Sequence, residues 1–364
     1  MIGSRCIHQS FYFMHRGIRL GVIGAMGEPV TYLTEESYRP DWLKDGVTEA
    51  SLKAVLGAKV EIQRLGRELA KAERFYLVGS GGSYSVQFPV RYLAEKYTDI
   101  PLLQYSGWEF LERIPWAANE GSACVFISQS GKTKEVVRAQ EWAKKNGAFT
   151  MGLSQKQDSV INKAGDIGFG TGARGVTMGK LTTLYLLFGT VLKEKGFEVG
   201  GRMIKAAESL PTVLLPMIPK AMEFAKKTAL KFKDDGEMYV LGGGINWGLA
   251  YQYAICTLQE MCWIHATPIN YSEFRHGPVE MFTPGVPAIF LRSRGNEGEL
   301  EKAVVNWCTK NGVKGIVLDS QGGEVDNLLT PFTLFVELEW LSYYLSLAKN
   351  RDMAQWRYYD KVEW

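Results

Sequence analysis

The stretch that decides the fold is Arg74–Ser85, which reads RFYLVGSGGSYS. A short aromatic and aliphatic run ends in glycines and leads into the helical pattern VQFPVRYLAEKY. This order predicts a buried strand, a glycine-rich turn and a helix. The same order returns from Ser122, where SACVFIS runs into QSGKTKEVVRAQEWAKKNG. Strands and helices that alternate with short connections are typical of a parallel, doubly wound sheet.

The second half of the chain repeats this pattern. The segment YVLGGGINWGLAYQYAI from Tyr239 matches the segment from Tyr76, an offset of 163 residues (from 76 to 239). Aligning Phe290 with Phe126 matches a second pair of segments at an offset of 164 (from 126 to 290). We therefore predict an α/β protein with two tandem, flavodoxin-like doubly wound domains and parallel sheets. The expected divisions are an N-terminal extension (1–45), a first domain (46–200), a helical connector (201–235), a second domain (236–347) and a tail (348–364).

Composition limits the classes of function. The chain has 364 residues, 46% hydrophobic and 22% charged, with a net charge of +3, which describes a globular protein and gives no basic excess for nucleic acid. No apolar run reaches the roughly 18 residues of a membrane span. Basic and polar residues interrupt the N-terminal stretch, so we do not expect a signal peptide. Five scattered cysteines are typical of a reduced compartment. We expect a cytoplasmic protein without a membrane partner.

Two loops could hold a phosphate group. The segment Ser128–Thr133, SQSGKT, lies between a predicted strand and a helix, where unpaired N–H groups and the helix dipole favour an anion. Its candidate ligands are Ser128, Gln129, Ser130 and Thr133, and Gly131 lets the backbone approach closely. Ser83 follows the neighbouring strand in a loop opened by Gly81, where ligands of doubly wound sheets collect. The alternative is that Ser130 or Thr133 only caps the helix.

The glycine loops also resemble part of a dinucleotide-binding motif. Gly79–Tyr84 contains G-x-G, but Tyr84 stands where the third glycine belongs, and Trp247 stands there in the second copy. This partial match gives weak support to a nicotinamide enzyme. The second copy also carries Glu297 in place of the Ser128–Thr133 cluster, and its charge would repel a phosphate. We expect only the first copy to bind one.

The segment Glu260–Pro278, EMCWIHATPINYSEFRHGP, supplies candidates for acid/base chemistry. We expect one helix over residues 246–265 with Glu260 near its last turns. Glu260 falls on an apolar face, where an ionised carboxylate is rarely found unless it has a function or a partner. A salt-bridged glutamate is the alternative. His276 precedes Gly-Pro at a turn, and a histidine can titrate near neutral pH, which suits acid/base catalysis. The alternative role for His276 is a hydrogen bond that stabilises the turn. Cys256, Cys262 and His265 lack a fourth ligand, so we expect no metal.

Together, GSGGS, SQSGKT, E-M-x-W-I-H and S-E-F-x-H-G-P resemble the sugar isomerase (SIS) double-domain proteins. The pattern is similar to the isomerase half of glucosamine-6-phosphate synthases, and closer to the fructosamine 6-phosphate deglycases. The Trp-Ile-His stretch and the ending KVEW favour the deglycases. The resemblance covers residues from about 50 to the C-terminus.

The resemblance implies a role for each matching residue. Glu260 would move a proton between C1 and C2 of the sugar, and His276 would open the ring from the partner subunit of a homodimer with shared sites. Glu273 would position His276 or a substrate hydroxyl, and His265 would be packed or would support the site from outside the ligand's direct contacts. The 6-phosphate would be bound by the two loops, at Ser83, Ser128, Gln129, Ser130 and Thr133, supported by Gly81 and Gly131. No cofactor is implied.

Two departures qualify the match. The synthase pattern has a lysine three residues before the glutamate, and this chain has Thr257 there. The synthase also has a cysteine after its initiator methionine, whereas this chain has Ile2, so we do not expect ammonia delivery from glutamine. The expected function is deglycation of a 6-phosphorylated fructosamine to glucose 6-phosphate and an amine.

Two alternatives stay open: a glucosamine-6-phosphate deaminase or aldose–ketose isomerase, and a sugar-phosphate-sensing module. The identity of the amine also stays open. The aromatic tail could line its site or pack the C-terminus onto a dimer; its aromatic members are Trp356, Tyr358, Tyr359 and Trp364.

Overall fold

The computed structural model describes residues 32–293, 298–319, 326–358 and 361, and those from Leu33 onward belong to one compact unit. Its first sheet has five parallel strands in the order β2-β1-β3-β4-β5. In this order the chain changes direction across the sheet between β1 and β3, which is where doubly wound proteins bind ligands. The strands are β1 (Arg74–Gly79), β2 (Leu102–Tyr105), β3 (Ser122–Ile127), β4 (Phe149–Ser154) and β5 (Ile167–Gly170).

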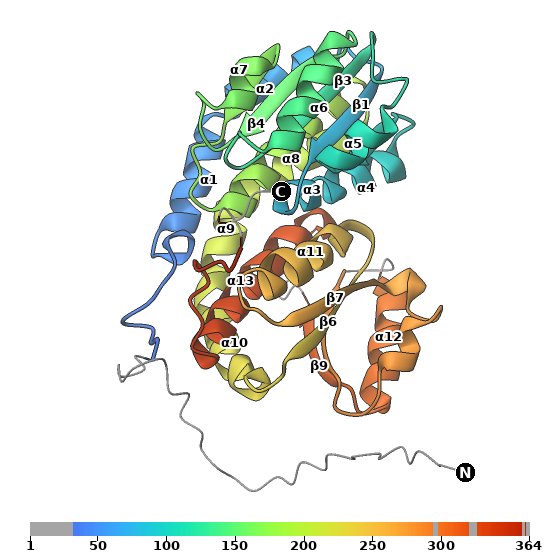
Figure 1. The fold of residues 1–364 in the computed structure, drawn as a ribbon. Coiled ribbons are helices and arrows are strands. Elements are labelled where there is room, and N and C mark those ends of the chain that lie inside the picture. Colours follow the sequence, from blue (N-terminus) through green and yellow to red (C-terminus); the bar gives the residue numbers. More distant parts are fainter. Residues whose placement is uncertain (1–31, 294–297, 320–325, 359–360, 362–364) are drawn as a thin grey trace, which may run out of the picture. The chain divides into compact units, whose positions relative to one another are not determined.

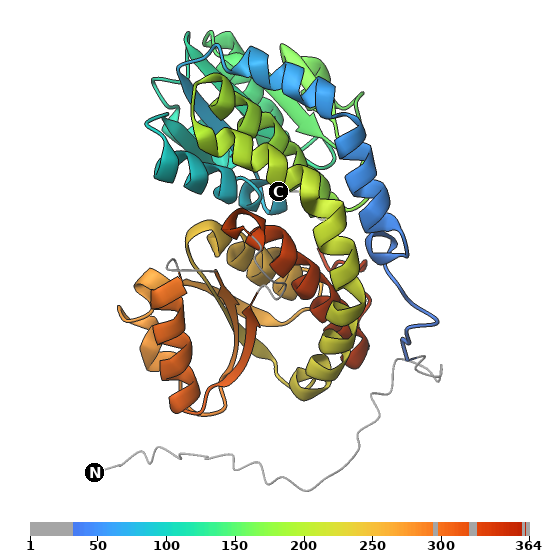
Figure 2. The ribbon, with the colours of Figure 1, turned by 180° about the vertical axis from the view of Figure 1, so that it is seen from behind.

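The alternation of side chains along these strands sends them to two cores. Phe75 and Leu77 of β1 face a large central core with α1, α2 and α8, whereas Tyr76 and Val78 face a smaller core with α5 and α6. Figures 1 and 2 show these two groups of helices on opposite faces of the sheet. The helices around this sheet are α1 (Val47–Gly57), α2 (Lys59–Leu69), α3 (Gly82–Ser85), α4 (Phe88–Tyr97), α5 (Gly107–Arg113), α6 (Lys134–Lys145), α7 (Val160–Ala164) and α8 (Val176–Glu194), preceded by the 3-10 turn η1 (Asp41–Leu43).

The second sheet repeats the first with four parallel strands in the order β7-β6-β8-β9. They are β6 (Glu237–Gly242), β7 (His265–Asn270), β8 (Pro287–Arg292) and β9 (Lys314–Asp319). The main helices of this half are α9 (Glu198–Leu214), α10 (Ile218–Phe232), α11 (Trp247–Gln252), α12 (Glu299–Lys310) and α13 (Thr330–Ala348). Short turns are η2 (Leu215–Met217), η3 (Gly244–Asn246), η5 (Tyr271–Glu273), η6 (Pro278–Met281) and η8 (Asn327–Leu329). The predicted α/β class with two parallel sheets is confirmed.

The two halves meet through close backbone packing and buried polar bonds. Gly248 on α11 lies so near α3 that a Cβ there would stand 2.5 Å from the Ser85 carbonyl oxygen. Ser85 Oγ donates to Gln252 Oε1 at 3.2 Å, and Gln252 Nε2 donates to Thr177 Oγ1 at 2.7 Å. These contacts fix the helix that leads to Glu260 against the glycine loop of the first half.

The expected single helix over residues 246–265 is wrong. After α11 the chain widens into the π-helical segment η4 (Tyr253–Gln259), and His265 begins strand β7. His265 is paired with Glu237 in the parallel ladder with β6. An apolar run fits a helix or a buried strand equally well, and the sheet decided between them. Among the described helices, none is long and apolar enough to cross a bilayer.

Candidate active site

The loop after β3 gathers three hydroxyl groups. Ser128 is buried, and its Oγ lies 2.7 Å from Thr133 Oγ1 and 3.5 Å from Ser130 Oγ. The Gly131 N–H donates to Ser128 Oγ at 3.1 Å. Gln129 is half-buried beside them, and its carbonyl accepts from the Gln155 N–H at 3.2 Å. The cluster presents several donors within the small volume that a phosphate fills.

The N-terminus of α6 opens directly onto this cluster. Thr133 is the N-cap residue, yet its side chain makes no capping bond and faces Ser128 instead. The first N–H groups of the helix are therefore left for another acceptor, as at many anion sites. Gly131 is required here: its φ is 68°, and an added Cβ would lie 2.3 Å from Ser159 Cβ. The alternative reading of Thr133 as a simple side-chain cap does not fit this geometry.

The glycine loop after β1 lies beside the hydroxyl cluster, because β1 and β3 are neighbours. Ser80 Oγ donates to Glu135 Oε1 at 2.7 Å and ties the loop to the first turn of α6. Gly81 has φ 55°. Ser83 is buried on α3, so its hydroxyl faces into the protein at the carboxyl end of the sheet.

Lys180 is a residue that the sequence reasoning missed. It lies on α8, is 2% exposed, and its Nζ donates to Ser83 Oγ at 3.0 Å. Burial lowers the pKa of Lys180 to about 8. Because an ammonium has donors only, Ser83 Oγ accepts this bond and keeps its own hydrogen for another acceptor. The sequence signal was a lysine inside the apolar run VTMGKLTTLYLLFG, where a charge is unexpected.

The second copy fills the corresponding place with its own carboxylate. Glu301 on α12 is buried and accepts hydrogen bonds from the Ser293 backbone N–H and, at 3.0 Å, from Ser293 Oγ. An anion at this position thus stabilises the loop after β8 internally. Glu297, which the sequence suggested as the excluding charge, lies outside the described residues. Glu301 is the third residue of α12, whereas the third residue of α6 is Val136, which follows the Glu135 that binds Ser80.

Glu260 follows the π-helical segment directly. Its backbone N–H donates to the Ile255 carbonyl at 3.2 Å, five residues back, so the widened turn reaches Glu260 and sets its direction. Burial raises the pKa of the Glu260 carboxyl above its usual value, and a hydrogen bond from the Trp356 side chain partly offsets this rise. Within the described residues, Glu260 has no ion pair with a lysine or arginine, so the salt-bridged alternative does not apply.

Glu260 is joined to the phosphate loops through Cys256. A Cβ added to Gly81 would lie 3.6 Å from Cys256 Sγ, and Cys256 stands one turn before Glu260 on the π-helical segment. Burial, helped by the nearby Glu260 charge, raises the pKa of the Cys256 thiol to about 12, so the thiol stays neutral. Cys256 is therefore the residue through which the segment of Glu260 approaches the glycine loop of the first half.

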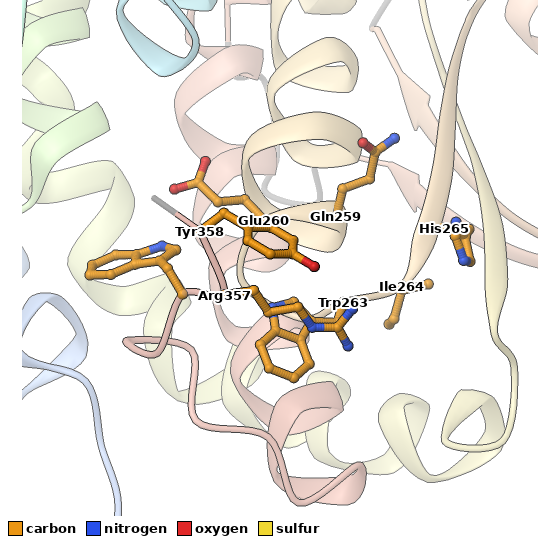
Figure 3. Close-up of a pocket in the computed structure, with 8 residues that line it drawn as sticks. Gln259, Glu260, Trp263, Ile264, His265, Arg357 and Tyr358 are labelled. Carbon is orange, nitrogen blue, oxygen red and sulfur yellow. The ribbon is translucent and has the colours of Figure 1, made fainter. Parts of the chain in front are cut away.

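The side chain of Glu260 lines a cavity of about 410 Å³. The other lining residues come from the stretch around Glu260 and from the C-terminal tail: Gln259, Trp263, Ile264, His265, Trp356, Arg357 and Tyr358 (Figure 3). His265 is exposed rather than packed, which corrects the expectation for it. Tyr359 and Trp364, the other aromatic tail candidates, lie outside the described residues.

His276 and Glu273 lie apart from this cavity. Both are exposed, at and just after the turn η5, and the His276 backbone N–H donates to the Glu273 carbonyl at 2.9 Å. Neither side chain lines the cavity that holds Glu260. The two predicted acid/base residues are therefore not brought together within one described chain. In the described part of the chain, no three His, Cys, Asp or Glu side chains are grouped to hold a metal.

Comparison with known proteins shows which family model the first sheet matches. Residues 68–192 match the model of the SIS domain, which spans the first sheet from the end of α2 to most of α8. Both phosphate-loop candidates and Lys180 fall inside the match. The predicted resemblance to the SIS family is confirmed over these residues.

Full-length relatives and solved structures extend the likeness to both halves. The chain is 29% identical to fructoselysine 6-phosphate deglycase of Escherichia coli K12, covering 79% of this chain and 85% of the relative. It is 28% identical to a fructosamine deglycase of Bacillus subtilis, covering 80% and 93%. The C-terminal domain of glucosamine-fructose-6-phosphate aminotransferase from Francisella tularensis superimposes with a TM-score of 0.75 at 22% identity, covering 89% and 100%, and shares the fold.

Proposed function

We propose that this SIS-domain chain is a deglycase that converts a 6-phosphorylated fructosamine to glucose 6-phosphate and a free amine. The observation that carries the proposal is the position of Glu260, a half-buried carboxylate one turn from Cys256, which in turn packs against Gly81 of the first phosphate loop. A proton-transferring carboxylate next to a phosphate site suits a phosphorylated sugar. The relatives named as deglycases support the same reaction.

The phosphate would be bound at the switch point of the first sheet. Ser128, Ser130 and Thr133 supply hydroxyl groups, Gln129 lies beside them, and the N-terminus of α6 supplies N–H groups. From the next loop, Ser83 donates its hydroxyl hydrogen while accepting from Lys180. Glu301 in the second copy supports this assignment, because the corresponding position there holds an anion of the protein itself.

Glu260 would carry both proton transfers. It removes a proton from C1 of the open-chain ketoamine while O2 takes up a proton, giving an enaminol, and it returns a proton to C2 as the nitrogen loses its own. The product is an imine at C1, and water adds across its C=N bond to release the amine and leave the aldehyde of glucose 6-phosphate. A raised carboxyl pKa favours this role, because the group must both accept and donate a proton.

His276 would assist ring opening from a second copy of the chain in a homodimer. Its exposed side chain does not line the Glu260 cavity of its own chain, which is compatible with its acting on the sugar of a partner subunit. Glu273, close to it on the same turn, would orient it or bind a sugar hydroxyl.

The test is a coupled assay of glucose 6-phosphate release from fructosyl-amino acid 6-phosphates. We expect Glu260→Gln to lose about 10²–10⁴-fold in kcat, since general acid/base help is worth that much. Undiminished turnover by Glu260→Gln would disprove the role of this residue. Binding of the sugar phosphate without turnover by the native chain would instead point to a sensor, and ammonia release from glucosamine 6-phosphate to a deaminase.

A further inference from the structure

The C-terminal tail folds over the cavity of Glu260. Arg351 and Met353 are buried, which anchors the segment, and the next residues line the cavity: Trp356, Arg357 and Tyr358. Figure 3 shows Arg357 alongside Trp263, with His265 set apart. The cavity therefore has one wall from the catalytic stretch and one from the tail.

Trp263 is held between two arginines. The guanidinium of Arg351 lies 3.2 Å from the centre of its ring and that of Arg357 lies 3.8 Å from it. The backbone of Trp263 has φ 55°, a conformation that a bulky side chain adopts only where its surroundings fix it. A guanidinium stacked by its face keeps the N–H groups of its edge for a ligand, and that edge fits a carboxylate in two-point fashion.

The charges in the cavity select the kind of ligand. Arg357 is exposed and supplies a cation to the lining, whereas Arg351 is buried behind the ring. Glu260 is the single Asp or Glu among the described lining residues. The carboxylate of a ligand can pair with Arg357. A further ammonium group on the ligand would have to pair with Glu260, which the reaction itself needs.

The position of Glu260 sets which part of the substrate reaches this cavity. On one side, Cys256 connects Glu260 to Gly81 and the phosphate loops, where C6 would be held. On the other side lies the wall formed by the tail. With C1 at Glu260, the substituent on C1 extends away from the phosphate and into the cavity.

We propose that this cavity is the subsite for the amine half, and that its ligand is an amino acid glycated on its α-nitrogen, with the α-carboxylate paired to Arg357. The proposal rests on the proposed deglycase function. In an α-linked compound the secondary amine lies next to Glu260 and the carboxylate two bonds further on, which suits two charged residues of one 410 Å³ cavity. In an ε-linked lysine compound, a free α-ammonium would accompany the carboxylate to Arg357, and the lining offers that ammonium no acid besides Glu260.

The test compares two substrates that differ in one charge: fructosyl-glycine 6-phosphate and fructosyl-glycinamide 6-phosphate. For the native chain, we expect kcat/KM to be at least tenfold higher for the glycine compound, because a charge-assisted hydrogen bond is worth that much. Arg357→Gln should bring the ratio towards one, mainly by lowering kcat/KM for the glycine compound. Arg67→Gln, which removes an exposed arginine on α2, should leave the ratio unchanged.

Each outcome bears on the subsite or on the deglycase function separately. Equal losses on both substrates in Arg357→Gln, or no preference in the native chain, would overturn the carboxylate subsite while leaving the deglycase function standing. Calorimetric measurement of the binding of both compounds identifies the opposite case, in which the subsite exists but the deglycase activity does not. If the native chain turns over neither compound but binds the glycine compound tenfold more tightly through Arg357, the subsite stands and the deglycase function falls. A higher kcat/KM for Nε-fructosyl-lysine 6-phosphate than for the glycine compound would also overturn the α-linked assignment.

Discussion

Lys180 Nζ lies 3.0 Å from Ser83 Oγ, and both side chains are buried. The two residues are 97 positions apart in the sequence, on helices α8 and α3. A buried ammonium behind a hydroxyl orients that hydroxyl and adds positive potential to the proposed phosphate site in front of it. This pair therefore links the buried helix α8 to the predicted ligand.

Lys180→Met should weaken binding of the phosphorylated substrate. We expect KM to rise about tenfold or more with a smaller change in kcat, because the lost interaction acts on the phosphate rather than on C1. Lys205→Met, an exposed lysine on α9, is the matched control and should have no effect. Steady-state kinetics decides the matter; an unchanged KM in Lys180→Met would remove Lys180 from the phosphate site.

The same lysine should give a basic limb to the pH profile. The pKa of Lys180 is lowered to about 8, so its positive charge is present below that pH and lost above it. The kcat/KM of the native chain should therefore fall as pH rises through about 8, and this limb should be missing from Lys180→Met. The neighbouring Cys256 thiol does not produce a limb at this pH, because its pKa is about 12.

Trp356→Phe should move the acid limb of the same profile. Burial raises the pKa of Glu260, and the Trp356 hydrogen bond lowers it by stabilising the carboxylate. Removing the indole N–H raises the pKa further, so more of the carboxyl is protonated and inactive as a base at mildly acidic pH. The midpoint of the acid limb of kcat/KM should shift to higher pH; a shift to lower pH would contradict the assignment of Glu260 as the base.

Gly131→Ala should disrupt the phosphate loop. The added Cβ would lie 2.3 Å from Ser159 Cβ, and the alanine would have to adopt φ 68°. Gly172→Ala imposes a similar φ of 63°, but no atom lies within 4 Å of the added Cβ. The backbone cost common to both is about 1–2 kcal/mol. We expect a larger loss of unfolding free energy in Gly131→Ala by urea titration, together with a raised KM that Gly172→Ala does not show. Equal effects would mean that the loop tolerates the added methyl group.

Gly248→Ala tests whether the contact between the two halves sets the position of Glu260. Its Cβ would stand 2.5 Å from the Ser85 carbonyl oxygen, so α11 must move away from α3. We expect kcat to fall by about tenfold or more, since small displacements of catalytic groups are costly. Gly201→Ala on α9 adds the same methyl group into open space and should stabilise the helix by about 0.5–1 kcal/mol. A normal kcat in a folded Gly248→Ala variant would show that the packing is dispensable.

Local sequence patterns were sufficient for much of the fold and for the phosphate loop. The strand Arg74–Gly79, its glycine turn and the repeat from Glu237 follow from short-range alternation and turn chemistry, which do not depend on distant residues. Ser128–Thr133 could be found because all its hydroxyl groups lie within one strand-to-helix connection. The residue roles of Glu260 and His276 came from the family resemblance and stay predictions.

Tertiary structure decided what depends on residues far apart in the chain. It brought Lys180 to Ser83, placed Trp356 and Arg357 around Glu260, and turned the expected helix end at His265 into a strand paired with β6. Periodicity records which side of an element is apolar, but not which distant side chain packs there. The sequence by itself therefore determined two α/β repeats and one candidate anion-binding loop, because these arise from neighbouring residues. The charges around Ser83 and Glu260 were set by packing between elements, and only the folded chain shows them.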